Sequence, residues 1–491
     1  MKKTTRLIPA ALLALAPIAA SAFEFEISLW RGETTDALVW ESQILGEAPA
    51  GLTVRRATLK PVKYAPRPMS VQLLEARDRV AWDGEDPGPQ VVEVTADPDM
   101  KPGVYKCGMV DIRVVDRVLP PAKEWKYYLD LWQHPWAVSR WHGVEPFSDA
   151  HFRVMRPIWE MLASAGQKTL TCTLLDRPWD HQCFDAYGSM IGRVKRADGS
   201  WKFDYTVFDR YVAFGRSCGL GPDIACYTMC PWGYVVRYQK EDGETVAVKC
   251  KPGEPAFDDY WGDFLVDFAA HLKEKGWFKD TLIAMDERSP EDVRYIVDFV
   301  RRKAPGLRIS MAGSFSAAQL KEMAIESYCS HLKPERLTPE YLALVPERRA
   351  KGMITTYYVC CSPARPNTFM SNGPGEAFWV GVFPAFAGLD GLLRWAWNSW
   401  PRDPMQDATF ARWAAGDTYF VYPDGSPSWR FLELRNGIVA AEKLRILKER
   451  GLFADEIAKL LPRFDVKKAT EGKCDFASTR EAVMKLVNRD K

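Results

Sequence analysis

The feature that most limits how this chain can fold is an alternation of strand-like and helix-like segments between residues 126 and 400. Short apolar runs rich in β-branched and aromatic residues are followed by segments with helical spacing of their apolar residues, or by loops. Strand candidates that alternate with helices indicate parallel pairing through βαβ units. Eight strand candidates occur here, at residues 126–132, 168–175, 222–229, 280–287, 307–313, 325–331, 352–361 and 391–400.

Eight such units over this length predict a (β/α)8 barrel of the TIM type. The alternative is a doubly wound parallel sheet, which usually carries a glycine-rich phosphate loop after its first strand. No such loop follows residues 126–132. We therefore favour the barrel, with an insertion of hairpin character after the third strand candidate.

The segments on either side of the barrel predict two further parts. Short alternating strands separated by turn clusters such as DGEDPGP predict a β-sandwich over residues 23–122. Consecutive prolines at Pro120 and Pro121 hold the chain extended and mark a linker. The catalytic barrel is expected over residues 123–427. The pattern of residues 428–491 is helical and predicts a C-terminal extension packed on the barrel.

The first 22 residues predict export. A basic start, an apolar run and the residues Ala-Ser-Ala have the layout of a secretory signal peptide, with cleavage after about Ala22. The apolar run is shorter than the roughly 20 residues that a membrane-spanning helix needs. We expect the mature protein to be periplasmic or secreted and not held in a membrane.

Composition makes some partners improbable. The 66 basic and 64 acidic residues give a net charge of +2, which does not suggest nucleic acid as a partner. Eleven cysteines is an odd number, so at least one thiol stays free, and any pairing of the others cannot be deduced. No Cys-x-x-Cys motif is present, and we expect neither a metal nor a cofactor. The oligomeric state is left open by the sequence.

The ends of the predicted strands carry the chemistry. In a (β/α)8 barrel the C-terminal strand ends face the active site. Here they gather carboxylates for proton transfer, aromatic rings for stacking on sugars and polar groups for hydroxyls, at Asp130, Trp132, His134, Asp176, Arg177, Tyr227, Trp232, Tyr234, Asp286, Glu287, Ser314, His331, Tyr357, Tyr358, Arg394, Trp395, Trp397, Asn398 and Trp400.

The adjacent acids Asp286 and Glu287 stand out among these residues. Neighbouring side chains in a regular strand point to opposite faces, but at a strand end both can enter one cavity. Two carboxylates at such a short distance repel each other when both are ionised. The pKa of one therefore rises, and that group can donate a proton. The structural alternative is that both acids only begin the next helix, although Ser289 already fits its N-cap.

Four segments resemble the catalytic domain of glycoside hydrolase family 123, a family that groups exo-acting β-N-acetylgalactosaminidases with many other proteins. They are YLDLWQHPWAVSRWHGVEPFSDAHF, YTMCPWGYVVRYQ, the pair Asp286-Glu287 and GLLRWAWNSWPRDP. The resemblance covers about residues 125–450 and includes a β-sandwich before the barrel. It implies release of a terminal β-linked N-acetylhexosamine, most of all N-acetylgalactosamine, with retention and with the substrate's own 2-acetamido oxygen as nucleophile.

The resemblance also implies roles for single residues. Glu287 would be general acid and then general base, and Asp286 would hold the acetamido N–H. Tyr358, or less favourably Tyr357, would donate to the acetamido oxygen. The remaining candidates would bind the sugar, with Trp397 and Trp232 as the floor and Asn398, Arg394, Asp130 and His134 facing hydroxyls.

Two other functions stay open. A conventional retaining glycosidase would use Glu287 as acid and a distant carboxylate such as Asp130 or Asp176 as nucleophile. A non-catalytic glycan-binding protein would use only the aromatic cleft. Arg288 departs from the family pattern, in which proline often follows the acid pair, and its guanidinium could hold one carboxylate ionised.

Overall fold

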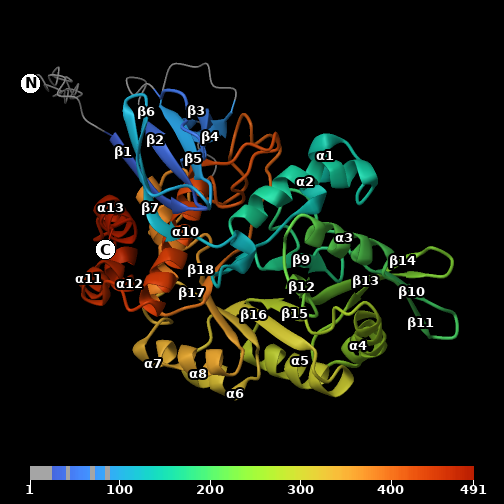
Figure 1. The fold of residues 1–491 in the computed structure, drawn as a ribbon. Coiled ribbons are helices and arrows are strands. Elements are labelled where there is room, and N and C mark those ends of the chain that lie inside the picture. Colours follow the sequence, from blue (N-terminus) through green and yellow to red (C-terminus); the bar gives the residue numbers. More distant parts are fainter. Residues whose placement is uncertain (1–24, 40–44, 67–71, 83–88, 491) are drawn as a thin grey trace, which may run out of the picture.

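The computed structural model describes residues 25–39, 45–66, 72–82 and 89–490, so the predicted signal peptide lies outside the described residues. Figure 1 shows a β-rich part near the N-terminus, a barrel of strands and helices, and a group of helices near the C-terminus that lies beside both. Within the described part of the chain, every helix is too short or too polar to cross a membrane.

Two sheets form the N-terminal part. The first contains β1 (Phe25–Arg31), β7 (Val110–Val118) and β6 (Gly103–Cys107), and the second contains β2 (Thr34–Val39), β5 (Gln90–Ala96), β3 (Leu52–Tyr64) and β4 (Leu74–Ala81). Alternate residues of both sheets are buried in one core, among them Ile27, Leu29, Val92, Val94, Ile112 and Val114. Because this burial has a period of two on both sheets, the predicted β-sandwich is confirmed.

Eight parallel strands form the barrel. They are β8 (Tyr128–Leu131), β9 (Thr169–Thr173), β12 (Asp223–Tyr227), β15 (Thr281–Asp286), β16 (Arg308–Gly313), β17 (Ser327–His331), β18 (Ile354–Tyr358) and β19 (Gly391–Arg394), in the order β8-β19-β18-β17-β16-β15-β12-β9. Strands β9, β12 and β17 are buried along their whole length, as expected where helices cover one face and side chains fill the other. All eight predicted strands are present, and the barrel is confirmed.

The barrel closes between β8 and β9 largely through glutamine side chains. The backbone N–H of Lys168 donates to the Leu129 carbonyl at 2.9 Å. The side-chain oxygen of Gln167 accepts from the N–H of Leu131 at 3.0 Å, and that of Gln133 accepts from the N–H of Thr171 at 2.8 Å. These amides satisfy backbone groups that would otherwise be buried without a partner.

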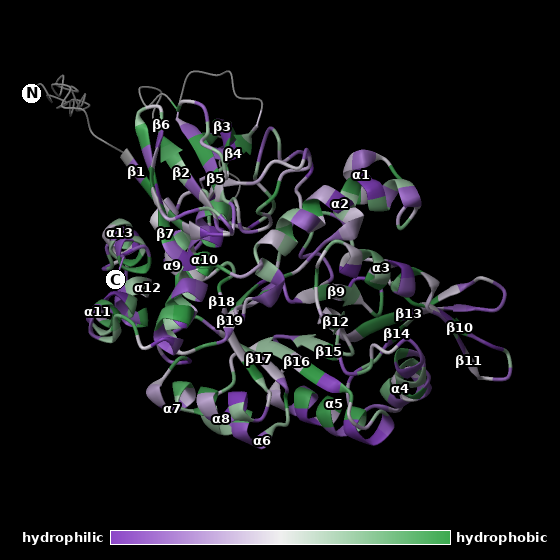
Figure 2. Ribbon diagram, viewed as in Figure 1, coloured by the Kyte–Doolittle hydropathy of each residue, from purple (hydrophilic) through white to green (hydrophobic). Residues whose placement is uncertain are grey.

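Helices cover the outside of the barrel. They are α1 (Pro135–His142), α2 (Asp149–Ser164), α3 (Thr206–Ser217), α4 (Pro255–Glu274), α5 (Pro290–Lys303), α6 (Ala317–Glu322), α7 (Pro339–Leu342), α8 (Leu344–Ala350) and α9 (Pro374–Ala387). Helices α4 and α5 carry both hydrophobic and hydrophilic residues (Figure 2), as helices between a core and solvent do. The predicted N-cap of α5 is present, because the Ser289 side chain accepts from the N–H of Asp292 at 3.2 Å.

A small second sheet extends from the barrel. Its strands are β10 (Gly192–Lys195), β11 (Trp201–Asp204), β13 (Val235–Lys240) and β14 (Thr245–Lys249), in the order β11-β10-β13-β14. The sequence indicates only the β13–β14 hairpin. The structure adds a second hairpin from the loop after β9, which pairs with the first through the parallel contact of β10 and β13.

The C-terminal helices pack on the barrel, as predicted. They are α10 (Trp429–Glu449), α11 (Ala454–Leu460), α12 (Val466–Thr470) and α13 (Phe476–Val487). Helix α10 lies so close to α9 that a Cβ at Gly437 would sit 2.2 Å from the carbonyl oxygen of Phe378. Only glycine fits at this crossing.

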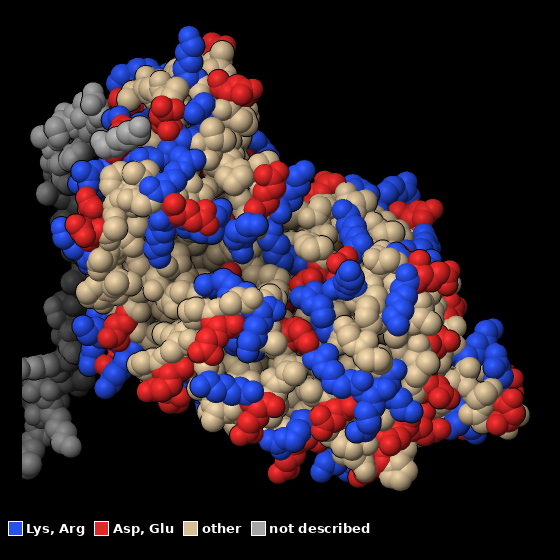
Figure 3. Space-filling view, turned by 60° about the horizontal axis from the view of Figure 1, so that its bottom comes forward, with Lys and Arg blue, Asp and Glu red and all other residues tan. Residues whose placement is uncertain are grey.

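Buried ion pairs join α10 to the β-sandwich. Arg430 contacts Asp78 at 2.9 Å, Arg435 contacts Asp36 at 2.6 Å, and Lys443 pairs with Glu33; all six side chains are buried. Helix α10 therefore contacts both the sandwich and the barrel. On the face in Figure 3, in contrast, acidic and basic side chains are intermixed at the surface, in agreement with the net charge of +2.

Candidate active site

The two acids lie at the C-terminal end of β15, where a barrel of this kind places its active site. Asp286 is the last residue of the strand and is half-buried, whereas Glu287 follows it and is exposed. Glu287 has φ = 48°, a left-handed conformation that residues other than glycine rarely adopt. Its N–H still donates to the Ala312 carbonyl of β16 at 2.8 Å. This turn interrupts the alternation of the strand and brings both carboxylates near Tyr358.

The environment of the pair favours one retained proton. Burial, and then the negative charge of Glu287, raise the pKa of Asp286 from 3.8 to about 8. Arg288 opposes this rise only in part. Its Nε donates to the backbone oxygen of Asp286 at 3.0 Å, and its guanidinium lies 5.7 Å from the centroid of the Trp232 ring. Among the described residues, Arg288 forms no ion pair with either carboxylate, so it does not neutralise the acid pair.

Tyr358 is the hydrogen-bond partner of Glu287. Its hydroxyl donates to Oε1 of Glu287 at 2.6 Å, and burial together with that carboxylate raises the pKa of Tyr358. Tyr357 points to the other face of β18, where its hydroxyl donates to the Val380 carbonyl of α9 at 2.6 Å. Of the two tyrosines considered from the sequence, Tyr358 therefore faces the acids.

Aromatic side chains surround the acid pair. Trp132 stacks on Trp179 with ring centroids 4.9 Å apart and lies 4.5 Å from Tyr227. Trp395 and Tyr358 belong to the same cluster, and Trp232 packs at its edge. The side chains of Trp132 and Trp179 hydrogen-bond to the carboxyls of Asp130 and Asp286, and these bonds oppose the rise in pKa that burial causes in the two acids. The indole N–H of Trp232 is buried without a hydrogen-bond partner among the described residues. Trp179 therefore joins the aromatic cluster to the acid pair.

The sequence matches the model of the glycoside hydrolase 123 catalytic domain over residues 132–447. The chain belongs to glycoside hydrolase family 123. It is a glycosidase by family, and its acids, tyrosine and aromatic cluster lie within the matched region. No protein among the curated sequences matches the chain.

A family 123 glycoside hydrolase from Clostridium perfringens has the same fold. It is 21% identical over 94% of this chain and 93% of its own, with a TM-score of 0.81. Two weaker matches are a xylanase with a bacterial Ig-like domain from termite gut, 10% identical over 86% and 100% of the two chains with a TM-score of 0.36, and a β-galactosidase from Marinomonas ef1, 11% identical over 67% and 61% with a TM-score of 0.38. Both of these TM-scores are too low to indicate a shared fold.

Three residues at and after β19, predicted to bind sugar, point away from the site. Trp397 is fully buried, with its ring 4.7 Å from that of Phe431 in α10. Arg394 is fully buried and pairs with Asp417 at 2.8 Å. The Asn398 amide accepts from the backbone N–H of His134 at 2.8 Å and donates to its carbonyl at 3.0 Å. The predicted sugar-binding roles of Trp397, Arg394 and Asn398 are wrong, because none presents a free group to the cleft.

Two further candidates are structural. His134 is fully buried, stacks on Tyr187 at 3.7 Å, and has Nε2 3.0 Å from the Asp185 carbonyl; burial lowers its pKa to about 3, so the ring is neutral. Asp130 is buried within the barrel and accepts a hydrogen bond from the Thr169 hydroxyl; burial raises its pKa to about 7. Both are buried among protein partners, which does not support their predicted contacts with sugar hydroxyls.

Two aromatic residues of the cluster were given no role from the sequence: Trp395 is named among the strand-end residues without one, and Trp179 is not named. Trp395 lies two residues beyond Leu393, and both belong to the inward-facing cluster, so the alternation of β19 continues by one step past the strand. This period of two was a usable signal. Trp179 comes from the irregular loop after β9, for which no periodic signal exists.

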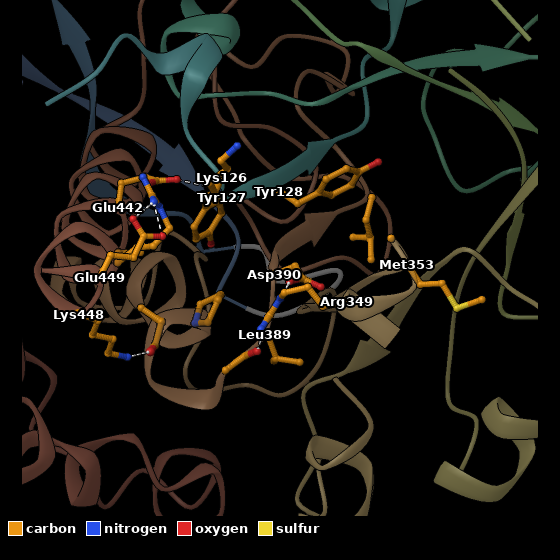
Figure 4. Close-up of a pocket in the computed structure, with 17 residues that line it drawn as sticks. Lys126, Tyr127, Tyr128, Arg349, Met353, Leu389, Asp390, Glu442, Lys448 and Glu449 are labelled. Carbon is orange, nitrogen blue, oxygen red and sulfur yellow. Dashed lines mark hydrogen bonds and ion pairs between the residues drawn. The ribbon is translucent and has the colours of Figure 1, made fainter. Parts of the chain in front are cut away.

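Two cavities lie at opposite ends of the barrel. The larger, about 810 Å³, lies beside Tyr128, Ile354 and Asp390 near the N-terminal strand ends (Figure 4). Several of its charged residues pair with each other, as in the 2.7 Å contact of Arg349 with Asp390. The other cavity, about 570 Å³, is lined by Glu287. Size alone would select the N-terminal end, whereas a barrel of this kind places its active site at the C-terminal end.

Proposed function

We propose that this protein is an exported, exo-acting glycosidase that removes a terminal β-linked N-acetylhexosamine, with N-acetylgalactosamine as the preferred residue, by substrate-assisted retaining catalysis. The observation that carries the proposal is the adjacent acid pair, in which Asp286 is held near aromatic rings and Glu287 is exposed beside Tyr358. Adjacent carboxylates suit an acetamido nucleophile better than a second carboxylate, which in conventional retaining enzymes stands about 5 Å away across the sugar.

The position of the shared proton gives the pair its mechanism. In the free protein near neutral pH the proton resides on Asp286, since its pKa is raised to about 8. An acetamido N–H that donates to Asp286 would favour its ionised form and leave the proton of the pair available to Glu287. Glu287 then protonates the departing oxygen while Asp286 stabilises the positive charge on the acetamido group. In the second half of the reaction Glu287 accepts a proton from water.

Tyr358 and Trp232 complete this site. Tyr358 would transfer its hydrogen bond from Glu287 to the acetamido oxygen, and the indole N–H of Trp232 would meet a sugar oxygen. The Clostridium perfringens relative is described in connection with glycolipid glycan hydrolysis. A glycan with a terminal N-acetylhexosamine is therefore the substrate class that we propose for this chain as well.

Hydrolysis of aryl β-glycosides tests the proposal. We expect turnover of the β-N-acetylgalactosaminide but not of the matching β-galactoside, which lacks the acetamido group. Glu287→Gln should lower turnover by about 10²–10⁴-fold. A matched control is Glu291→Gln in the first turn of α5, outside the site. Unchanged turnover in Glu287→Gln would remove this residue from the acid role.

Inhibition separates the proposal from its alternatives. A thiazoline that mimics the cyclised acetamido intermediate should bind tightly to a substrate-assisted enzyme and weakly to a conventional one. Binding of the sugar without turnover of any aryl glycoside would instead identify a glycan-binding protein.

A further inference from the structure

The cavity beside Glu287 has an unusual charge. Three cationic side chains line it, Arg288, Lys333 and Arg336, and all three are half-buried. Among the residues that the structure describes, its only acidic lining residue is Glu287 itself. Ser314, Ser362 and Gln319 add polar groups to the wall.

These cations have no acidic partner within the described part of the chain. Arg365, in the loop after β18 at the same end of the barrel, does have one, because it contacts Glu376 at 2.9 Å. Arg288 donates through Nε to a backbone oxygen, and its guanidinium lies 5.7 Å from the centroid of the Trp232 ring and 5.9 Å from that of the Tyr234 ring. Three like charges that share a hollow repel one another, and an anion between them would relieve that repulsion. Glu335, the nearby acid, is exposed and does not line the cavity.

The role of the cavity in the reaction depends on which of the two acids lines it. Glu287 lines it, whereas Asp286 does not and lies instead by Trp179 and Tyr227 in the aromatic cluster. The group that protonates the leaving oxygen must stand between the bound sugar and the leaving group. If Asp286 holds the sugar, the cavity on the other side of Glu287 receives the leaving group.

We infer that this cavity is a leaving-group site that accepts an anionic substituent, a sulfate or a carboxylate, on the part of the glycan released from the terminal N-acetylhexosamine. The inference rests on the proposed function and adds the substrate class. Lys333 and Arg336 are the residues that would distinguish an acidic glycan from a neutral one, and Arg288 would contact the same substituent.

The first experiment measures the charge of the cavity without using catalysis. Cys361 is exposed and lines the cavity, so it can report on approaching reagents. Mass spectrometry follows the rate at which Cys361 is modified by two methanethiosulfonate reagents, an anionic sulfonatoethyl and a cationic trimethylammonioethyl compound. The variant Cys361→Ser is the blank, and a free thiol in solution gives the reference rates. We expect the anionic reagent to be favoured at Cys361, and Lys333→Ala with Arg336→Ala to remove the preference. Equal reactivity in the unmodified protein would overturn the inference.

The second experiment measures specificity. Umbelliferyl β-N-acetylgalactosaminides with a neutral, a sulfonated and a carboxylated leaving group are compared by kcat/KM. We expect the anionic-to-neutral ratio to fall about three- to tenfold in the Lys333→Ala, Arg336→Ala variant and to fall with rising salt in the unmodified protein. Lys351→Ala, at an exposed lysine outside the cavity, is the matched control. Comparison of kcat/KM for the carboxylated and the sulfonated substrates shows which anion the cavity prefers.

The outcomes separate the two proposals. If the substrates are turned over but neither the double variant nor salt changes the anionic-to-neutral ratio of kcat/KM, this inference is overturned and the proposed function still stands. Absence of turnover on every leaving group would remove the proposed function and this inference together.

Discussion

Replacing Asp286 by asparagine should stabilise the folded protein, although Asp286 lies in the active site. Burial and the charge of Glu287 raise its pKa from 3.8 to about 8. Between these values the unfolded chain has lost the proton that the folded protein keeps. Unfolding therefore releases a proton, and stability falls as pH rises through this window until the penalty is complete above pH 8.

The size of the effect follows from the same shift. One pKa unit corresponds to about 1.4 kcal/mol, so the ionisable group costs the fold about 4 kcal/mol at pH 7. The side chain is only half-buried, and water that reaches it reduces this to about 2 kcal/mol. The neutral amide of the asparagine would carry no such penalty. We expect Asp286→Asn to raise the free energy of unfolding by about 2 kcal/mol at pH 7, by nothing near pH 4, and by more at pH 8.

Urea unfolding followed by tryptophan fluorescence at pH values from 4 to 9 would test this. Asp298→Asn, the same chemical change on the exposed side of α5, gives the baseline for the substitution itself. A gain that is equal at pH 4 and pH 8, or a loss of stability at pH 8, would refute the assignment of a raised pKa to Asp286. Hydrolytic activity of the variant should be low at every pH, so stability and activity change in opposite directions.

Three further predictions concern the pH profile, the corrected tryptophan and the domain contact. The kcat/KM of the unmodified enzyme should decline as pH rises through about 8, because the pair then loses its last proton; a flat profile to pH 10 would contradict the shared-proton scheme. Trp397→Ala should destabilise the protein by about 3–5 kcal/mol. Trp395→Ala, in the inward-facing cluster with Tyr358, should raise KM more than it lowers the unfolding midpoint, and the reverse pattern would restore Trp397 to the site. Asp78→Ala should lower the free energy of unfolding in urea by about 3–5 kcal/mol, because Arg430 is left buried without its partner. The control Asp116→Ala, at an exposed pair, should lower it by less than about 1 kcal/mol. Equal losses in the two variants would argue against a buried pair at Asp78.

The fold was predictable because its signals are local and repeated. Strand runs, helix caps such as Ser289 and turn clusters each restrict a few residues, and eight repetitions leave one architecture. The position of Asp286 and Glu287 at a strand end beside Tyr358 was predictable in the same way, and their role as acids stays a prediction. The seam between β8 and β9 was not predictable, since nothing local shows that Gln133 and Gln167 take the place of backbone pairing.

Side-chain direction beyond a strand end was the main failure, and Trp397 shows why. Strict alternation would place Leu393, Trp395 and Trp397 on one inward face, and the first two do face inward. At Trp397 the chain has already left the sheet, and its N–H donates to the Trp132 carbonyl at 2.8 Å while its carbonyl accepts from Phe420 at 2.8 Å. Its ring turns to Phe431, a residue of α10 distant in sequence. The direction is decided by that tertiary contact, which no local pattern contains.

The same reasoning explains why the acid pair carries backbone strain. Alternation alone would send Glu287 away from the face that Asp286 occupies, and only the left-handed turn at φ = 48° brings both near Tyr358. A non-glycine residue in that region costs about 1–3 kcal/mol and persists where the surroundings fix it. Here the bond from its N–H to β16 and the bond from Tyr358 both hold the turn. Two neighbouring residues thus each lower stability, one by its buried carboxyl and one by its backbone conformation. The proposed function, which needs both carboxylates on one sugar, would account for their being kept together.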